Sequence, residues 1–272
     1  MLVAEGISKH FSGIVALSGV DMQVSSGEIV GLVGPNGSGK STLLNVLSGF
    51  ISPDAGKVTF RGERLERRRP WDIAGRGLHR TFQIPTPPQR MTVLEVMLTG
   101  AHLPRGATMA QSLFRPGRVR AEQREAIERA SRLLDELTLL ELQHDSAGSL
   151  SGGQQKLLAL GVALMSDPDL LLLDEPTAGV NRSLRRVLVA RLRAVNDAGT
   201  ALVIVEHDMG FVGELCSRVY VLDKGEVLTC CPPSELAANP RVVEAYLGSR
   251  KQGRRPAVGV PRPKRDAGKV TS

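Results

Sequence analysis

A glycine-rich segment directly after a continuous apolar run is the feature that most constrains the fold of this chain. The run is Ile29–Val33, and the segment is residues 34–41, with the sequence GPNGSGKS. A continuous apolar run is typical of a strand that is buried on both faces of a parallel sheet. Residues 41–49 then show the pattern of a helix closed by glycine. Strand, glycine loop and helix in this order predict an α/β fold.

The same segment fits the pattern G-x-x-x-x-G-K-[ST], which describes a loop that holds phosphate groups. Glycines let the backbone wrap around the phosphates, and the N-terminus of the following helix adds its positive dipole end. We expect Lys40 to reach the β- and γ-phosphates of ATP and Ser41 to ligate Mg²⁺. The alternative, a glycine turn with an incidental lysine, is disfavoured by the flanking strand and helix. The residues expected to bind ATP here are Gly34, Pro35, Asn36, Gly37, Ser38, Gly39, Lys40, Ser41 and Thr42.

Two acidic residues follow a second apolar run, residues 170–173, all leucine. In parallel sheets, ligands bind beyond the carboxyl ends of the strands. Asp174 is therefore expected in the Mg²⁺ shell, and Glu175 beside the γ-phosphate, where it orients or deprotonates the attacking water. A strand that runs into a solvated acidic turn is the alternative, and the phosphate loop upstream argues against it.

The middle of the chain is expected to form a helical lobe inserted into the α/β core at about residues 84–165. Residues 91–142 have a helical pattern that is broken near 104–117. Within this stretch, 119–140 is charged on one face and apolar on the other. The apolar face is expected to contain Ile127, Leu133, Leu134 and Leu137.

Alternating strands and helices before and after this lobe predict a parallel sheet covered by helices. The expected strands are residues 2–4, 20–24, 29–33, 57–61, 170–173, 201–205, 219–222 and 226–228, and the expected later helices are 152–165 and 182–196. We predict one domain over residues 1–248 and a disordered tail over 249–272.

The net charge of +7 argues against nucleic acid as a partner because of where it lies. Residues 249–272 hold eight Lys and Arg and one acid, so the remaining 248 residues balance to zero. A nucleic-acid groove would place the basic excess on the folded part. For the tail itself, attraction to anionic lipid headgroups and a solvated segment without a role both stay open.

Cysteine usage and hydropathy indicate the cellular compartment in which this protein works. Three cysteines without a C-x-x-C spacing argue against a disulfide framework and a zinc site, which favours the reducing cytoplasm. We expect no signal peptide and no membrane span, since the longest apolar region, residues 157–173, is interrupted by SDPD at 166–169.

A third motif identifies a family. Leu150-Ser151-Gly152-Gly153-Gln154-Gln155 resembles the signature motif of the ABC ATPases, and it lies ahead of the strand that ends in two acids. Alone, such a run is usually a helix N-cap with a flexible start. The resemblance implies that Ser151 and Gly153 bind the γ-phosphate of ATP held by a second subunit, with Gly152 and Gln154 also among the ATP-binding residues, so that two composite sites form head to tail.

Other positions are carried over from the resemblance one by one. Gln83 resembles the glutamine that senses Mg²⁺ and the attacking water, and His207 the switch histidine that touches the γ-phosphate. Phe11 resembles the aromatic that stacks on adenine, with Val15 beside it, although a core position is the open alternative. Asn181 stands where the family usually has an aspartate, which puts the contact across the subunits in doubt. The resemblance thus implies Glu175, His207 and Gln83 as catalytic and Ser41, Gln83 and Asp174 as metal ligands.

Within the family, residues 1–248 are most similar to the ATP-binding subunits of branched-chain amino acid importers. The similar features are Arg80-Thr81-Phe82-Gln83, the insert at 104–117, Glu206-His207-Asp208-Met209 and Ala245-Tyr246-Leu247-Gly248. Importers of urea or short amides and the lipopolysaccharide exporter remain alternatives, because no residue here touches the solute. A soluble ABC ATPase that acts in DNA repair or on ribosomes is disfavoured by the single phosphate loop and the neutral body. A fold that binds nucleotide without turnover is disfavoured by Glu175 and His207.

The resemblance implies a P-loop ATPase core with a mostly parallel sheet, an N-terminal antiparallel β subdomain and an inserted α-helical subdomain. It also implies an ATP hydrolase that requires Mg²⁺ and works at the cytoplasmic face of the inner membrane. The expected partners are a second ABC ATPase subunit, identical or a paralogue, transmembrane permease subunits, and a periplasmic or extracellular solute receptor.

Overall fold

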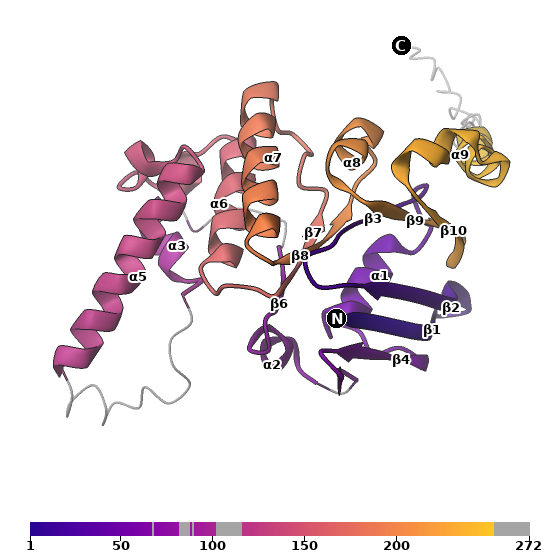
Figure 1. The fold of residues 1–272 in the computed structure, drawn as a ribbon, viewed down its shortest axis with the longest axis horizontal. Helices are drawn as coiled ribbons and strands as arrows, with labels where there is room; N and C mark the ends of the chain where they lie inside the picture. The colour runs from indigo at the N-terminus through magenta and orange to yellow at the C-terminus, as the bar shows by residue number, and fades with distance from the viewer. Residues whose placement is uncertain (67, 82–87, 89, 102–115, 253–272) are drawn as a thin grey trace, which may run out of the picture.

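The computed structural model describes residues 1–66, 68–81, 88, 90–101 and 116–252, which form two sheets with helices around them (Figure 1). The strands are β1 Leu2–Phe11, β2 Ile14–Val24, β3 Ile29–Val33, β4 Ala55–Phe60, β5 Glu63–Arg64, β6 Leu78–Arg80, β7 Leu170–Asp174, β8 Ala201–Val205, β9 Arg218–Asp223 and β10 Glu226–Cys231. The α-helices are α1 Lys40–Leu47, α2 Pro70–Ala74, α3 Val93–Leu98, α5 Pro116–Glu136, α6 Gly152–Leu164, α7 Arg182–Asp197, α8 Met209–Leu215 and α9 Pro240–Gln252. Short 3₁₀ turns occupy Leu140–Leu142 (η1), Ala147–Ser149 (η2) and Pro233–Ala238 (η3).

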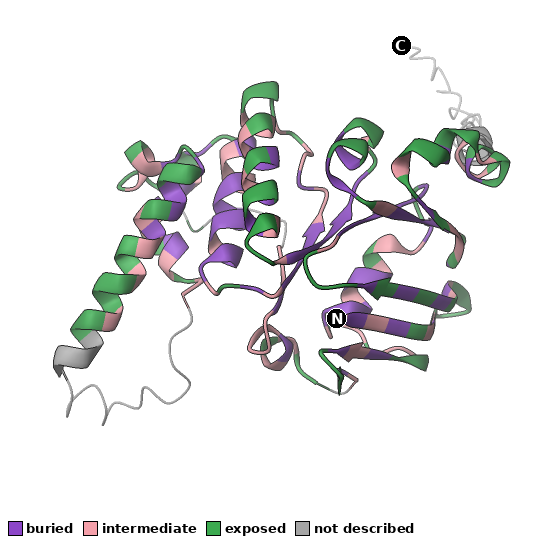
Figure 2. Ribbon diagram, viewed as in Figure 1, coloured by how far each residue is buried: buried purple, intermediate pink, exposed green. Residues whose placement is uncertain are grey.

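The larger sheet has the order β10-β9-β3-β8-β7-β6 and is parallel except for β10, which pairs antiparallel with β9. Its two faces belong to different cores. Leu171 and Leu173 pack in a cluster with residues of α6, α7 and α8, whereas Leu170 and Leu172 pack in a cluster with residues of α1. Strands β3, β7 and β8 are therefore buried along nearly their whole length (Figure 2). The predicted α/β class with a mostly parallel sheet is confirmed.

The smaller sheet has the order β2-β1-β4-β5 and is antiparallel, which confirms the N-terminal β subdomain. Its strands β1 and β2 extend well beyond the residues 2–4 and 20–24 that the sequence predicts. Both strands pass through glycines with positive φ, Gly6 and Gly19, and the pairing register shifts near these points. The alternation of apolar and polar residues is lost at such irregularities, so the pattern does not reveal the full strands.

Between β6 and β7 the chain forms a helical arm of α3, α5 and α6, seen at the left of Figure 1. The three helices contact one another, and Gly161 permits the close approach. A Cβ atom at Gly161 would lie 2.7 Å from the Met97 sulfur and 2.9 Å from Leu137 Cδ1. The limits of the lobe, residues 84–165, stay a prediction, and most of the predicted break at 104–117 lies outside the described residues.

The predicted apolar face of α5 is correct near its C-terminal end, where Leu133, Leu134 and Leu137 are buried. Ile127, however, is 42% exposed. Toward its N-terminal end, α5 extends beyond α3 and α6 (Figure 1). Periodicity marks one face of a helix but does not tell how far the neighbouring helices reach.

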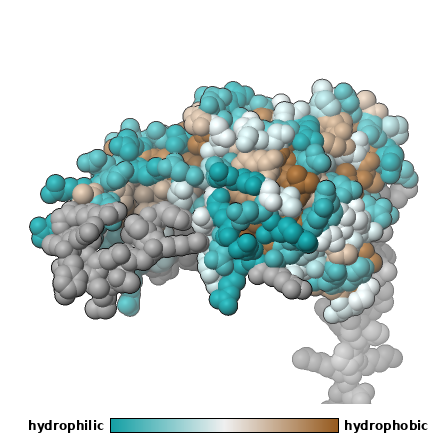
Figure 3. All heavy atoms as spheres, turned by 60° about the horizontal axis from the view of Figure 1, so that its bottom comes forward, coloured by the Kyte–Doolittle hydropathy of each residue, from teal (hydrophilic) through white to brown (hydrophobic). Residues whose placement is uncertain are grey.

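The C-terminal part of the chain departs from the prediction at one point. Helix α9 continues to Gln252, past the position where the sequence predicts that the disordered tail begins, and residues 253–272 lie outside the described part. All three cysteines are free thiols. No helix among the described residues is long and apolar enough to cross a bilayer. The surface in Figure 3 is mostly hydrophilic, with smaller hydrophobic areas between.

Candidate nucleotide site

The glycine loop connects β3 to α1 and depends on two glycines for steric reasons. Gly34 has φ 154, and a Cβ there would lie 2.0 Å from the Leu222 carbonyl oxygen. Gly39 has φ 104, and a Cβ there would lie 2.5 Å from the Ala16 carbonyl oxygen. The loop is thus held against β9 and the start of β2, where larger residues do not fit. Within the loop, Pro35 and Ser38 are buried, whereas Asn36, Gly37 and Ser41 are exposed.

The first turn of α1 is open for an anion. Gly39 is its N-cap and supplies no side chain to its amides, so the N–H groups that a capping side chain would satisfy face the loop instead. Thr42 is half-buried in the same turn. Amides and a positive dipole end in this arrangement fit phosphate.

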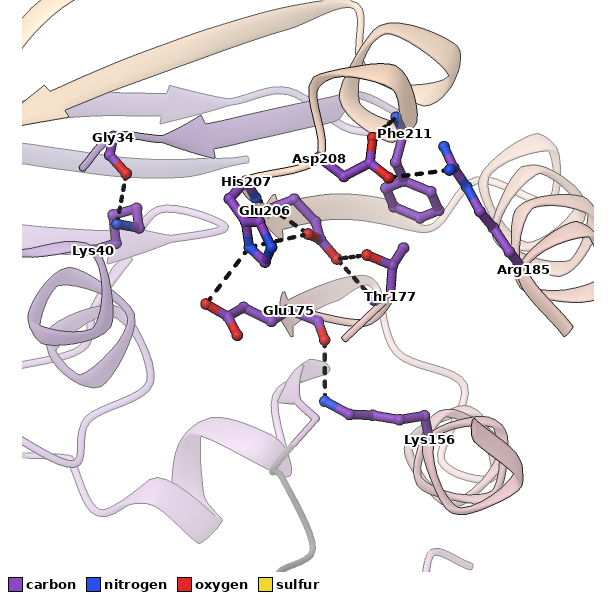
Figure 4. Close-up of polar contacts among 10 residues, drawn as sticks. All are labelled: Gly34, Lys40, Lys156, Glu175, Thr177, Arg185, Glu206, His207, Asp208 and Phe211. Carbon is purple, nitrogen blue, oxygen red and sulfur yellow. Dashed lines mark hydrogen bonds and ion pairs between the residues drawn. The ribbon is translucent and has the colours of Figure 1, made fainter. Parts of the chain in front are cut away.

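The Lys40 side chain folds back onto the backbone of the loop and contacts Gly34 (Figure 4). Its ammonium donates hydrogen bonds to the carbonyl oxygens of Gly34 and Pro35, each at 2.9 Å. Partial burial lowers the pKa of Lys40, while the carboxylates of Glu175 and Asp174 act in the opposite direction. A lysine that is desolvated and held by neutral carbonyls is ready to exchange them for charged phosphate oxygens.

Asp174 stands at the end of β7 and is paired with an arginine that the sequence analysis did not assign to the site. Arg80 Nη2 donates to Asp174 Oδ2 at 3.0 Å, and Arg80 Nη1 donates to Asn45 Oδ1 of α1 at 2.6 Å. Arg80 comes from β6, a strand of three residues that is too short for a periodic signal. The parallel pairing of β6 with β7 places both residues at the same sheet edge.

Of the three residues that the sequence analysis predicts to ligate a divalent cation, Asp174 and Ser41 lie within the described part of the chain. Among the described residues, no group of three or more His, Cys, Asp or Glu forms a metal cluster. Mg²⁺ commonly takes only one or two carboxylates and completes its shell with phosphate and water, so these residues fit it as a companion of bound nucleotide. Gln83, the third predicted ligand, lies outside the described residues.

Glu175 adopts a left-handed backbone conformation with φ 46, which is uncommon for a residue with a side chain. Its backbone is held by hydrogen bonds to other elements as well as by one within its own turn, from the Ala178 amide to the Glu175 carbonyl at 3.2 Å. Its amide donates to the Val205 carbonyl at 2.9 Å, and its own carbonyl accepts from Lys156 Nζ of α6 at 3.0 Å. A non-glycine residue keeps such a conformation only where the surrounding structure imposes it. Lys156 was not predicted, because nothing in the sequence pattern links it to this turn.

His207 lies across from Glu175, with 4.0 Å between His207 Nδ1 and Glu175 Oε1 (Figure 4). Its side chain is 67% exposed, so it can reach a ligand above the sheet edge. The predicted Glu175, His207 and Asp174 therefore gather at the carboxyl ends of β7 and β8, and the charges of Glu175 and Asp174 act on Lys40.

Glu206 is a buried carboxylate that accepts hydrogen bonds from the residues around it at this sheet edge. Its Oε1 accepts hydrogen bonds from the Thr177 amide at 2.8 Å and from Thr177 Oγ1 at 2.6 Å, and its Oε2 accepts from the His207 amide at 3.2 Å. The residue is 1% exposed. A carboxylate with three donors is well satisfied despite its burial, and it ties the turn after β7 to the end of β8.

Phe11 and Val15 lie at the hairpin between β1 and β2, and both side chains are exposed. Phe11 is 42% exposed and Val15 50%. The Lys9 ammonium lies 5.6 Å from the centre of the Phe11 ring. An exposed ring beside an exposed aliphatic side chain disagrees with a core position and leaves a surface on which a base could stack.

The signature residues start α6 with a capping box. Ser151 Oγ accepts from the Gln154 amide, and Gln154 Oε1 accepts from the Ser151 amide at 2.9 Å. Ser151 and Gly152 are exposed, and Gly153 is buried, since a Cβ there would lie 2.9 Å from Leu184 Cδ1. Helix α6 packs in the core on the face of the large sheet opposite α1. The two helices that carry the phosphate loop and the signature thus belong to different layers.

Asn181 has a local role that is compatible with the departure from aspartate. It is the N-cap of α7, and its Oδ1 accepts from the Leu184 amide at 3.0 Å and from Ser183 Oγ at 2.7 Å. Asparagine and aspartate cap helices about equally well, so the substitution preserves this turn.

Comparisons with known proteins agree with this geometry. Residues 17–178 match the family model described as ABC transporter. The probable branched-chain amino acid transport ATP-binding protein LivG of Archaeoglobus fulgidus is 40% identical over 252 residues, which cover 92% of this chain and 96% of that protein. The high-affinity branched-chain amino acid transport ATP-binding protein BraF of Pseudomonas aeruginosa is 34% identical over 251 residues, 91% of this chain and 98% of that protein.

Solved structures give the same result. A nucleotide-free ATP-binding cassette from an ABC transporter aligns with a TM-score of 0.79 at 36% identity and covers 90% of this chain and 98% of that one. Another ATP-binding cassette, in its ADP conformation, aligns with a TM-score of 0.78 at 35% identity, with 91% and 98% covered.

Proposed function

Because the chain belongs to the ABC transporter family as an ATP-hydrolysing subunit, we propose that it powers an importer of branched-chain amino acids. The observation that carries the proposal is the similarity over nearly the full length to relatives whose names state this transport. We infer a peripheral position at the cytoplasmic face of the membrane, through permease subunits that pass the solute from an external receptor.

Within the site, the phosphates of ATP would lie on the loop from Gly34 to Ser41, and Lys40 would exchange its carbonyl partners for phosphate oxygens. Mg²⁺ would be held by Ser41, Asp174 and Gln83, where it would neutralise charge on the phosphates. The exposed ring of Phe11 would carry the adenine.

Hydrolysis would then depend on Glu175, which orients the attacking water and accepts its proton. His207 would contact the γ-phosphate from the end of the neighbouring strand. The fixed backbone of Glu175 supports this assignment, because Lys156 and the Val205 carbonyl hold the residue in one conformation. A positioned base requires little reorganisation in the transition state.

The binding site for the γ-phosphate would be completed by the signature residues of a second subunit. The counterparts on this chain, Ser151, Gly152, Gly153 and Gln154, would serve the site of that subunit. The exposed start of α6, on the opposite face of the sheet from α1, supports this head-to-tail arrangement. The second subunit would be a paralogue or an identical copy of this chain.

Uptake by a strain that lacks this chain tests the transport proposal. We expect uptake of labelled leucine to be lost and to return with the parent gene but not with Glu175→Gln, while urea and short-amide uptake persist. If leucine uptake continued and urea or amide uptake were lost, the solute assignment would be wrong. If all three persisted, the importer role itself would be rejected.

A further inference from the structure

The residue that follows His207 is anchored to a neighbouring helix by an arginine that the site as described does not use. Asp208 is the N-cap of α8, and its Oδ1 accepts a hydrogen bond from the Phe211 amide at 3.0 Å. Its other oxygen, Oδ2, accepts from Arg185 Nη1 of α7 at 3.0 Å (Figure 4). One carboxylate thus caps α8 and at the same time ties that helix to α7.

Arg185 contacts the first turn of α8 at a second point. Its guanidinium carbon lies 5.5 Å from the centre of the Phe211 ring, which is the geometry of a cation–π contact. Phe211 is buried, and its amide is the one that Asp208 caps. A Cβ atom at Gly210 would lie 3.1 Å from Asp208 Oδ1 and 3.7 Å from Arg185 Nη2. The guanidinium is therefore packed against this turn as well as paired with its cap.

The orientation of His207 depends on its backbone, because its side chain is 67% exposed and little packing restrains it. On one side, the His207 amide donates to Glu206 Oε2 at 3.2 Å, and Glu206 is buried. On the other side, the next residue is Asp208, which is held by Arg185. A rotation of the peptide between His207 and Asp208 would turn the imidazole away from Glu175, whose Oε1 lies 4.0 Å from His207 Nδ1.

The helix that carries Arg185 starts from the other half of the site. Helix α7 follows the turn after Glu175 and is capped by Asn181. The contact between Arg185 and Asp208 therefore joins the segment after β7 to the segment after β8. These are the two strands whose ends carry Glu175 and His207.

We propose that Arg185 is a positioning residue for His207. By holding Asp208 and the first turn of α8 against α7, it keeps the imidazole directed at the γ-phosphate of bound ATP. This role rests on the proposed action of His207 in ATP hydrolysis. Because Arg185 acts through His207 and not on the nucleotide, its loss should lower the rate of hydrolysis and leave ATP binding unchanged.

Replacement of Arg185 by methionine in the full chain, purified with the subunits that accompany it, tests the proposal. Methionine keeps an unbranched apolar side chain but removes the charge and the donors. We expect kcat to fall by about ten- to hundredfold, the scale that misplacement of a catalytic group costs, with KM for ATP close to the parent. Tm should change little, because the side chains of Arg185 and Asp208 are 32% and 37% exposed. Single-turnover hydrolysis of labelled ATP measures the rate even in slow variants.

A second arginine of α7 provides the matched control. Arg193 Nη2 donates to the Glu214 carbonyl, near the C-terminal end of α8, at 3.0 Å. The Glu214 side chain lies 3.8 Å from Arg193 Nη2 and 4.0 Å from Arg185 Nη2. Arg193→Met thus removes a contact between α7 and α8 without touching Asp208, and it should keep the parental kcat. Parental kcat in Arg185→Met, or an equal loss in both variants, would overturn the proposal.

Asp208→Ser tests the same contact from the other side. Serine caps a helix about as well as aspartate, but it is too short to reach Arg185. We expect kcat to fall as in Arg185→Met, and the double variant to be no slower than Arg185→Met alone, because both changes break one contact. Parental kcat in Asp208→Ser would contradict the proposal.

A His207→Ala background separates positioning from a general structural effect. Without the imidazole there is nothing left to position, so Arg185→Met should lower kcat little further. If His207→Ala lowered kcat and Arg185→Met still caused its full loss on top, Arg185 would not act through His207, and only its role would be rejected. If His207→Ala hydrolysed ATP at the parental rate, the proposed action of His207 itself would be wrong.

Discussion

At the scale of single residues, the site combines side chains that we propose to act on nucleotide with side chains that only hold them in place. Glu175 belongs to the first kind, and Glu206 and Lys156 to the second. Lys156 bonds the Glu175 carbonyl, and Glu206 bonds the Thr177 amide two residues later. The turn after β7 is thus fixed on both sides, which explains how Glu175 keeps a left-handed conformation that its side chain disfavours.

Glu175→Gln should separate binding from hydrolysis. The amide keeps the size of the side chain but cannot accept a proton, so kcat should fall by about 10²–10⁴ while nucleotide affinity stays at the parent value. ATP should then trap a closed dimer, measurable as a shift in size-exclusion elution. Glu226→Gln, at the exposed start of β10, is the control and should behave as the parent. Hydrolysis at the parental rate in Glu175→Gln would remove Glu175 from the role of base.

Arg80 should matter for stability as well as for the site. Its side chain is 9% exposed and it pairs with Asp174, which is 21% exposed. Replacement by methionine leaves the carboxylate of Asp174 partly buried without its cation, and we expect the free energy of unfolding to fall by about 2–4 kcal/mol. Urea denaturation measures this change.

Arg61→Met is the comparison for this prediction. Arg61 pairs with Asp169 at 2.6 Å, but both side chains are well exposed, at 60% and 43%. Its replacement should change the free energy of unfolding by less than about 1 kcal/mol. Equal effects of the two substitutions on the free energy of unfolding would show that the burial of the Arg80–Asp174 pair does not increase its contribution to stability.

At the scale of elements, the sequence predicts what has a strong local pattern. Strands β3 and β8 were predictable to the residue, because an apolar run bounded by polar residues has only one place in a sheet covered on both faces. Strand β6 was not, since three residues carry no period. Of the site, the phosphate loop, Asp174, Glu175 and His207 were predictable from their places at strand ends. Arg80 and Lys156 were not, because only tertiary packing brings them there.

The stability of the protein should depend on pH through one carboxylate of the small sheet, that of Asp54. Asp54, before β4, accepts from Lys9 Nζ at 2.6 Å and from the His10 amide at 2.7 Å. The hydrogen bond with Lys9, first, and that with His10 lower the pKa of Asp54 from 3.8 to about 2. Because its folded pKa lies below the unfolded value, the stabilisation is present well above 3.8 and is lost as the pH falls toward 2.

Thermal unfolding of the parent and of Asp54→Asn between pH 3 and 6 measures this dependence. The two Tm values should converge as the pH is lowered, because protonation removes from the parent the same charge that the substitution removes. In a Lys9→Met background, the effect of Asp54→Asn on Tm should shrink at every pH. A constant difference in Tm across this pH range would contradict the assigned cause.

At the scale of the whole molecule, the phosphate loop and the signature helix lie in different layers of one chain, and each is expected to serve a site shared with a second chain. This arrangement predicts complementation. The Lys40→Ala variant has a defective phosphate loop and an intact signature. The Ser151→Arg variant has a defective signature and an intact phosphate loop. Neither variant alone should hydrolyse ATP. When the two are mixed as self-associated dimers, about a quarter of parental activity should return, because half of the dimers are mixed and each has one intact site of two.

Ser149→Arg controls for the added charge and bulk, since Ser149 is exposed two residues before Ser151 and bonds only locally, with its Oγ donating to the Ser146 carbonyl at 2.7 Å. It should hydrolyse ATP at the parental rate by itself. No recovery in the mixture, together with hydrolysis by Ser151→Arg as a strict monomer, would place a complete site within one chain. Recovery near a quarter would instead require that each nucleotide is held between the loop of one subunit and the start of α6 in the other.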